Sequence, residues 1–452
     1  MKKSLFAFAA VTAFAGAAQA QSSVTVYGIL DVGYINSNSS LTNAQVGPSG
    51  SGPVTTNYAA VNTALPNGTL KQTQSLFGQS AEQTSRLGFK GTEDLGGGTS
   101  AFFTAEFGLS PNEQTLSGNT NGGLKNRQTF VGLKKNGLGD AAIGMQYTPL
   151  HIAVGKTDPG QQNNLTGSVI YTGQADSGVV GAQGGNTNAY TSRVANALTL
   201  NSEVIGGFQA HAIAVLNNNN STEVSTTTTA TGGNVNTNGW GLGADYTWNK
   251  LFLTANYTAL KQSTVAVNAS GASAFTTLAG VSQVFNSGAA SGPAGAGSAV
   301  AYNGLAVTGQ PINIQDNQGY VGATYDFGIL KAYASWVQRK ATDTQNSGIY
   351  QKRSAEQIGV RSFVTPTVEA WASAGVGTWT PAGYNQNSAH FNAWQLGSNY
   401  WLSKRTNLYA IYGQYAQANS TYATYGANGA VSTTNQTSLN TSNVALGIRH
   451  TF

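Results

Sequence analysis

Charged side chains in this sequence recur on one face of segments that alternate between polar and apolar residues. In Arg86-Leu-Gly-Phe-Lys-Gly91, Arg86 and Lys90 share one face, and the leucine and phenylalanine between them occupy the other. Glu106 likewise stands opposite to the phenylalanines of its own segment. Fixed charges against low-dielectric walls concentrate counter-ions in the water between them. The pattern therefore indicates electrostatic selection of ions rather than the making or breaking of bonds.

Residue sets that carry catalysis or hold metals do not occur in the sequence. The four histidines are scattered without ligand spacing, and there is no cysteine. The segment Val154–Thr157 imitates the end of a phosphate-binding loop, but Leu150 stands where that motif requires its first glycine. We therefore expect a protein that is not an enzyme and that uses no cofactor and no metal.

The amino-terminal residues resemble an export signal. Lys2 and Lys3 precede a short alanine-rich apolar run, which ends in the small-x-small sequence Ala18-Gln-Ala20. The sequence thus predicts a signal peptide at residues 1–20 and one mature domain at residues 21–452. Loss of the two lysines lowers the formal charge from +5 to +3 (5 − 2), which is too diluted along the chain to indicate a nucleic-acid partner.

The segment Ser442–Phe452 predicts how the fold closes. Its even-numbered residues, Val444 through Phe452, form a largely apolar face, whereas its odd-numbered residues are small, polar or basic. A full-length strand here must pair on both sides or leave an exposed edge. Pairing with the first strand removes the edge and closes a barrel whose apolar face meets lipid, with Phe452 at the interface.

Short turns alternate with long loops along the whole sequence, which is the arrangement of outer-membrane barrels. Only 9% of the residues are charged, against about 25% in soluble domains, and the mean hydropathy is −0.18. One long loop is expected from Asn36 to about Ser80. Sixteen strands are expected, at Val24–Tyr34, Ser85–Gly91, Thr99–Phe107, Arg127–Lys134, Asp140–Tyr147, Tyr190–Asn201, Phe208–Leu216, Gly239–Trp248, Leu251–Lys261, Gln318–Phe327, Leu330–Arg339, Ala355–Val364, Val368–Trp379, Asn392–Leu402, Asn407–Gln417 and Ser442–Phe452.

The Arg86–Gly91 motif and the terminal Gly-Ile-Arg-His-Thr-Phe452 resemble the second strand and the assembly signal of Gram-negative general diffusion porins, closest to the β-proteobacterial type. The resemblance implies an all-β, 16-stranded antiparallel transmembrane β-barrel in the outer membrane, with short periplasmic turns and long extracellular loops. It implies a third loop, about Thr148–Ala189, that folds inward. It also implies a homotrimer that contacts lipid and lipopolysaccharide, is recognised by the assembly machinery through Phe452, and lets ions and small hydrophilic solutes diffuse passively.

The resemblance also assigns candidate residues to a pore constriction. The basic wall is expected to contain Arg86, Lys90, Arg127 and Arg193. The acidic side and the third loop are expected to contribute Glu106, Lys156, Asp158 and Asp176. Two departures weaken the pattern, because Met145 follows Gly144 where the family has an arginine, and the loop lacks the Pro-Glu-Phe-Gly motif. We expect a weak preference for anions.

Two other functions fit the same barrel. A substrate-selective channel would need a line of aromatic residues or a specific charge ladder along the interior. A surface adhesin or phage receptor would use the barrel as a scaffold for its long loops, which are rich in asparagine and threonine.

Overall fold

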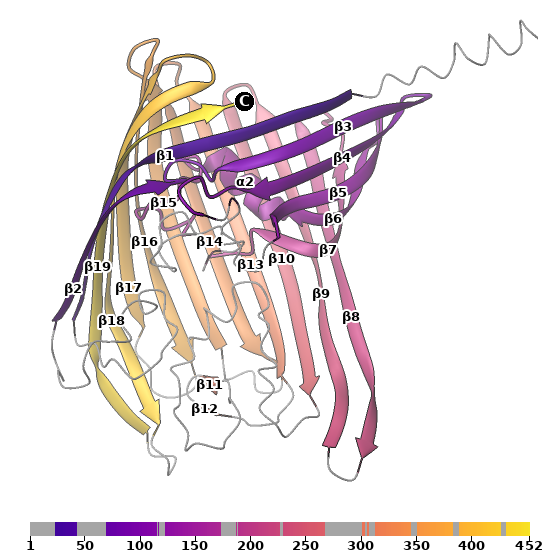
Figure 1. Ribbon diagram of the computed structural model, residues 1–452, viewed down its shortest axis with the longest axis vertical. Coiled ribbons are helices and arrows are strands. Elements are labelled where there is room, and N and C mark those ends of the chain that lie inside the picture. Colours follow the sequence, from indigo (N-terminus) through magenta and orange to yellow (C-terminus); the bar gives the residue numbers. More distant parts are fainter. Residues whose placement is uncertain are drawn as a thin grey trace, which may run out of the picture.

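The computed structural model is built almost entirely of antiparallel strands (Figure 1). It describes residues 23–42, 69–114, 116, 123–172, 187, 189–226, 229–266, 301–302, 305–306, 312–344, 350–382, 388–425 and 431–452. The strands are β1 (Ser23–Thr42), β2 (Thr69–Gln79), β3 (Arg86–Gly96), β4 (Thr99–Gly108), β5 (Lys125–Lys135), β6 (Gly139–Tyr147), β7 (Arg193–Ser202), β8 (Phe208–Thr226), β9 (Thr229–Trp248), β10 (Leu251–Ala266), β11 (Ala301–Tyr302), β12 (Leu305–Ala306), β13 (Ile312–Asp326), β14 (Lys331–Asp343), β15 (Tyr350–Phe363), β16 (Val368–Ala382), β17 (Ala389–Trp401), β18 (Thr406–Tyr425) and β19 (Val431–Thr451).

Seventeen of these strands form the main sheet, and they fill sixteen positions around it. Strand β1 pairs with β3 over Ser23–Ile29 and with β2 over Val32–Thr42, so β2 and β3 are two halves of one interrupted strand. The predicted number of sixteen is confirmed. The loop expected from Asn36 to about Ser80 is wrong at both ends, because β1 continues to Thr42 and β2 begins at Thr69. Polar residues on both faces there remove the period-two signal on which the prediction relied.

The sheet closes where the carboxyl-terminal strand meets the first. Residues Ile29–Thr42 of β1 pair with Ser438–Thr451 of β19. Gly28 and Phe452 extend this contact by exchanging two main-chain hydrogen bonds of 3.0 and 3.1 Å. A side chain at Gly28 would collide with the Phe452 ring, since its Cβ would lie 2.3 Å from that ring. The predicted closure is confirmed.

The two faces of the wall differ as the alternation predicts. Val131, Ile143, Ile358 and Leu446 point outward, with 62%, 63%, 68% and 52% of their surfaces exposed. Along β17, buried positions facing inward alternate with exposed positions facing outward. A strand of 20 residues such as β1 spans about 68 Å. An outer-membrane apolar band is about 25 Å tall, so the longest strands continue well beyond it.

The apolar outer face predicts a depth-dependent penalty for charge. Leu446→Arg, in the middle of the apolar row of β19, is expected to lower the free energy of unfolding by about 2–4 kcal/mol. Leu402→Arg beside a short turn should cost no more than about 1 kcal/mol. Reversible urea unfolding in lipid vesicles measures both. Equal costs at the two depths would contradict a lipid-facing Leu446.

Candidate functional site

The chain after β6 turns into the barrel as a short helix, α2 (Pro149–Thr157). Thr148 caps its amino end, where the side-chain oxygen accepts a hydrogen bond from the main-chain N–H of His151, and Pro149 begins the first turn. No helix was predicted in this low-charge stretch. Within the described ranges, no helix has the length and apolar character needed to cross a membrane.

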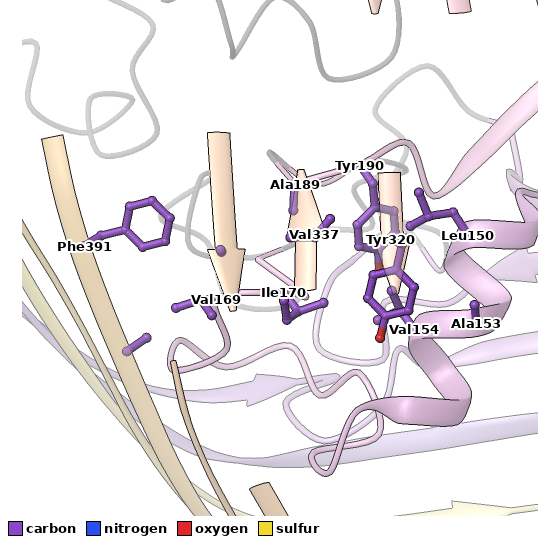
Figure 2. Close-up of a cluster of buried hydrophobic side chains, with 12 residues drawn as sticks. Leu150, Ala153, Val154, Val169, Ile170, Ala189, Tyr190, Tyr320, Val337 and Phe391 are labelled. Carbon is purple, nitrogen blue, oxygen red and sulfur yellow. The ribbon is translucent and has the colours of Figure 1, made fainter. Parts of the chain in front are cut away.

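The helix belongs to an inward segment, defined by the described residues 148–172, 187 and 189–192. Figure 2 shows its apolar side chains packed against the inner wall of the barrel. Leu150 and Val154 of the helix, with Tyr190, are buried in one cluster that includes Tyr320 of β13 and Phe391 of β17. Tyr190, expected to begin a strand, therefore lies in this segment instead. Burial of these faces removes apolar surface from the water of the interior.

Three arginines of the neighbouring wall hold the inward segment by its main chain. All three are buried and lie on β14 and β15. Each donates to a carbonyl of the segment: Arg339 to Thr187 (3.0 Å), Arg353 to Val169 (2.6 Å) and Arg361 to Pro159 (2.7 Å). Arg339 is also ion-paired with Asp316 at 2.6 Å, and Arg361 with Glu369 at 2.5 Å. These bonds fix the segment across the interior.

Three of the four residues predicted for the basic wall meet beside the inward segment, on the wall formed by β3, β5 and β7. Arg86, Arg127 and Arg193 line one cavity of about 160 Å³, together with Tyr147 and His151. The cavity is bounded by β3, β5 and β7 on the wall side and by α2 and the following residues on the segment side. Positive charges from three separate strands therefore gather at one place inside the barrel.

Glu106 lies within this basic group and not across from it. Its carboxylate accepts a hydrogen bond of 2.7 Å from Arg127 Nε and one of 3.1 Å from the Tyr27 hydroxyl. It is 3% exposed. It was expected on the acidic side of the constriction; the structure places it beside Arg127, because β4 and β5 are adjacent.

Arg127 reaches the interior through a β-bulge. Glu106 pairs with Gln128 whereas the next residue of β4 pairs with Asn126, so Arg127 is an extra residue in the ladder. Strict alternation would place Arg127 on the outer face with Val131, which is 62% exposed. The bulge turns its side chain inward, where Nη2 donates to the Tyr147 hydroxyl at 2.5 Å.

The two lysines of the prediction lie outside this cavity's lining. Lys90 is exposed, with its ammonium 5.5 Å from the centre of the Tyr27 ring. Lys156, at the end of α2, forms an ion pair of 2.6 Å with Asp245 of β9, and His211 contacts the same carboxylate at 3.3 Å. Lys156 thereby tethers the helix to the wall.

Asp158 does not present a charge to the interior water. It is 3% exposed and accepts hydrogen bonds from the main-chain N–H of Gln162 (2.6 Å) and the side chain of Gln357 (3.1 Å). Burial raises the pKa of its carboxyl above the ordinary value. Its expected role in an acidic wall is replaced by a structural one at the end of α2. Asp176 lies outside the described residues.

Aromatic rings that the sequence did not single out share the cavity with the arginines. The rings of Tyr147 and His151 lie 4.4 Å apart, and Tyr171 is 6.1 Å from His151. Burial, and then the charges of Arg193, Arg127 and Arg86, lower the pKa of His151 well below 6.5, so the ring is neutral. No local pattern could have indicated these residues, since their meeting depends on the fold of the inward segment. Among the described residues, no cluster of potential ligands could hold a metal ion.

A closed sheet with an apolar exterior and charges gathered inside defines a membrane-spanning β-barrel. The family model of the Gram-negative porins matches residues 7–420, and the chain belongs to this family. It is 34% identical over 165 residues to an outer membrane porin of Bordetella pertussis, and 36% identical over 149 residues to outer membrane porin protein 32 of Delftia acidovorans. These matches cover 35% and 33% of this chain, and 37% and 33% of the relatives, about a third of their length.

Solved structures show the same fold over nearly the whole chain. An anion-selective porin from Comamonas acidovorans matches with a TM-score of 0.56 and 20% identity, covering 95% of this chain and all of that one. A loop-deletion mutant of OmpT from Vibrio cholerae matches with a TM-score of 0.54 and 11% identity, covering 95% and 99%. The predicted barrel and its place in the outer membrane are confirmed.

The neutral state of His151 predicts how selectivity responds to pH. Between about pH 8 and about pH 5.5, His151→Asn should give the same profile of reversal potential against pH as the wild-type protein, because neither side chain carries charge. An ordinary histidine would gain a proton as the pH falls through 6.5 and would strengthen anion preference. Divergence of the two profiles at the acidic end would contradict the lowered pKa. Single-channel recordings in a salt gradient measure the potential.

Proposed function

We propose that the chain forms a water-filled channel through which ions and small hydrophilic solutes diffuse passively, with a preference for small anions. The single observation that carries the proposal is the gathering of Arg86, Arg127 and Arg193 around one interior cavity. Membership of the Gram-negative porins supports it, because porins are channels and not enzymes.

The balance of charge supports the anion preference. The three arginines and Glu106, which pairs with Arg127, together carry a net charge of +2 (3 − 1). Two unit charges about 4 Å apart interact by about 4 kcal/mol at an effective dielectric constant of 20. Low-dielectric walls on both sides strengthen the attraction of a counter-ion. The solved porin from Comamonas acidovorans is itself described as anion-selective.

We also propose that the chain associates with copies of itself, with membrane lipid and with the assembly machinery. A homotrimer is supported by one solved neighbour, OmpT of Vibrio cholerae, which is described as a trimer form. The exposed apolar outer face supports contact with lipid and lipopolysaccharide. Recognition of the Phe452 strand by the assembly machinery, and removal of residues 1–20 as a signal peptide, rest on the sequence patterns.

Removal of an interior arginine is the direct test of the proposed selectivity. Arg193→Gln is expected to shift the reversal potential in a salt gradient toward cations, because the cavity loses one positive charge. Lys340→Gln is the matched control, since Lys340 shares the outward face of β14 with Trp336, which is 38% exposed. Equal shifts in both variants would contradict a local effect. A wild-type protein that gives no conductance steps in a planar bilayer would reject the channel itself.

A narrower candidate is a channel selective for planar organic anions. The rings of Tyr147, His151 and Tyr171 favour it, because they line the same cavity as the arginines. Conductance should then saturate with benzoate at lower concentrations than with acetate, since an aromatic ring adds stacking and contact energy to the ionic attraction. Identical, non-saturating curves for the two salts would leave the general diffusion pore as the function.

A further inference from the structure

The interruption between β2 and β3, residues Ser80–Ser85, is folded inside the barrel, and the buried carboxylate of Asp31 is one of the groups that hold it there, beside the Asp31 main chain, which bonds Ser80 and Ser85. Asp31 of β1 is fully buried. Its Oδ2 accepts from the main-chain N–H groups of Glu82 (2.9 Å) and Gln83 (2.6 Å). Its Oδ1 accepts from the Tyr409 hydroxyl of β18 at 2.6 Å. Asn407 of β18 also donates to Glu82 Oε2 at 2.9 Å, so the strand break is attached to the wall on both sides of the closing seam.

The strand break is also hydrogen-bonded to the inward segment. Asn164 Nδ2 donates to the carbonyl of Ser80 (2.7 Å) and to the hydroxyl of Thr84 (3.0 Å), and its main-chain N–H donates to the carbonyl of Ala81 (2.9 Å). In addition, Gln83 Nε2 of the strand break donates to the carbonyl of Gln161 in the inward segment at 2.6 Å. Two stretches far apart in sequence are thus joined inside the barrel by four hydrogen bonds.

The same strand break orients one arginine of the cavity. Arg86 Nε donates to the carbonyl of Thr84 at 2.8 Å, and Nη2 donates to Gln83 Oε1 at 3.3 Å. Gln83 and Thr84 themselves line the cavity. A displacement of these residues would move the Arg86 guanidinium and the facing wall of the cavity together.

We infer that Asp31 is a positioning residue of the constriction: through the strand break it sets the place of Arg86 and of the inward segment. Asp31 is absent from the cavity lining, so it acts only through the residues it holds. The carboxylate suits the task because it accepts three hydrogen bonds at once from two elements. The inference rests on the proposed channel function and adds a residue that neither the charge pattern nor the cavity identifies.

The experiment compares three full-length variants in planar bilayers with the wild-type protein. Asp31→Ala should raise single-channel conductance and shift the reversal potential toward zero, because the N–H groups of Glu82 and Gln83, next to the Thr84 carbonyl that orients Arg86, lose their acceptor. Asp31→Asn should stay close to the wild type, since its amide oxygen accepts from the two N–H groups and Tyr409 accepts from its amide nitrogen. Glu356→Gln is the control, because Glu356 is exposed on the outer face of β15. It should match the wild type.

Each outcome of this experiment either supports or overturns the inference about Asp31. A folded Asp31→Ala barrel with wild-type conductance and reversal potential overturns the inference while the channel function stands. If Asp31→Ala does not fold, Asn164→Ala, which loosens the same contact from the inward segment, replaces it. Raised conductance in that variant supports the inference, and unchanged conductance overturns it. A wild-type protein without conductance overturns the proposed function and the inference with it.

Discussion

A chain laid inside a barrel must find hydrogen-bond partners for its main-chain carbonyls, and the rest of this structure depends on how that requirement is met. The wall supplies guanidinium groups from Arg339, Arg353 and Arg361, which reach three carbonyls of the inward segment. A guanidinium presents five N–H donors in a planar fork, so one group can bind a carbonyl and a carboxylate together. Without these donors the segment would lack its fixed path across the interior.

Arginine performs two different tasks here, and the environments of Arg339 and Arg361 differ from that of the cavity group in the balance between guanidinium groups and carboxylates. Arg339 and Arg361 sit beside Asp316 and Glu369, so their charge is compensated where they hold the segment. In the cavity group, three arginines line one cavity, and one of them, Arg127, pairs with the carboxylate of Glu106. Compensated arginines act as hydrogen-bond donors, whereas the excess positive charge of the cavity group acts over a distance on ions in the water.

Close contact between the segment and the wall depends on glycine. A Cβ at Gly413 of β18 would lie 1.6 Å from the carbonyl oxygen of Thr166, and one at Gly359 of β15 would lie 2.5 Å from the Pro159 ring. No side chain fits at either position while the segment keeps its place. Glycine within a strand often marks a site where another backbone approaches. In the sequence these glycines carry no sign of which residues approach them.

Local alternation was enough to predict the sixteen strand positions and most of their inner and outer faces, because the contrast between lipid and water acts on each strand separately. The Phe452 segment was enough to predict closure. The site was predictable only in part. Arg127 faces inward because of a bulge opposite Glu106 and Phe107, and Glu106 joins the basic group because β4 lies beside β5. Asp158 is buried by contacts with Gln357, nearly 200 residues away (357 − 158). Such placements depend on which distant residues meet, and only the folded barrel brings them together.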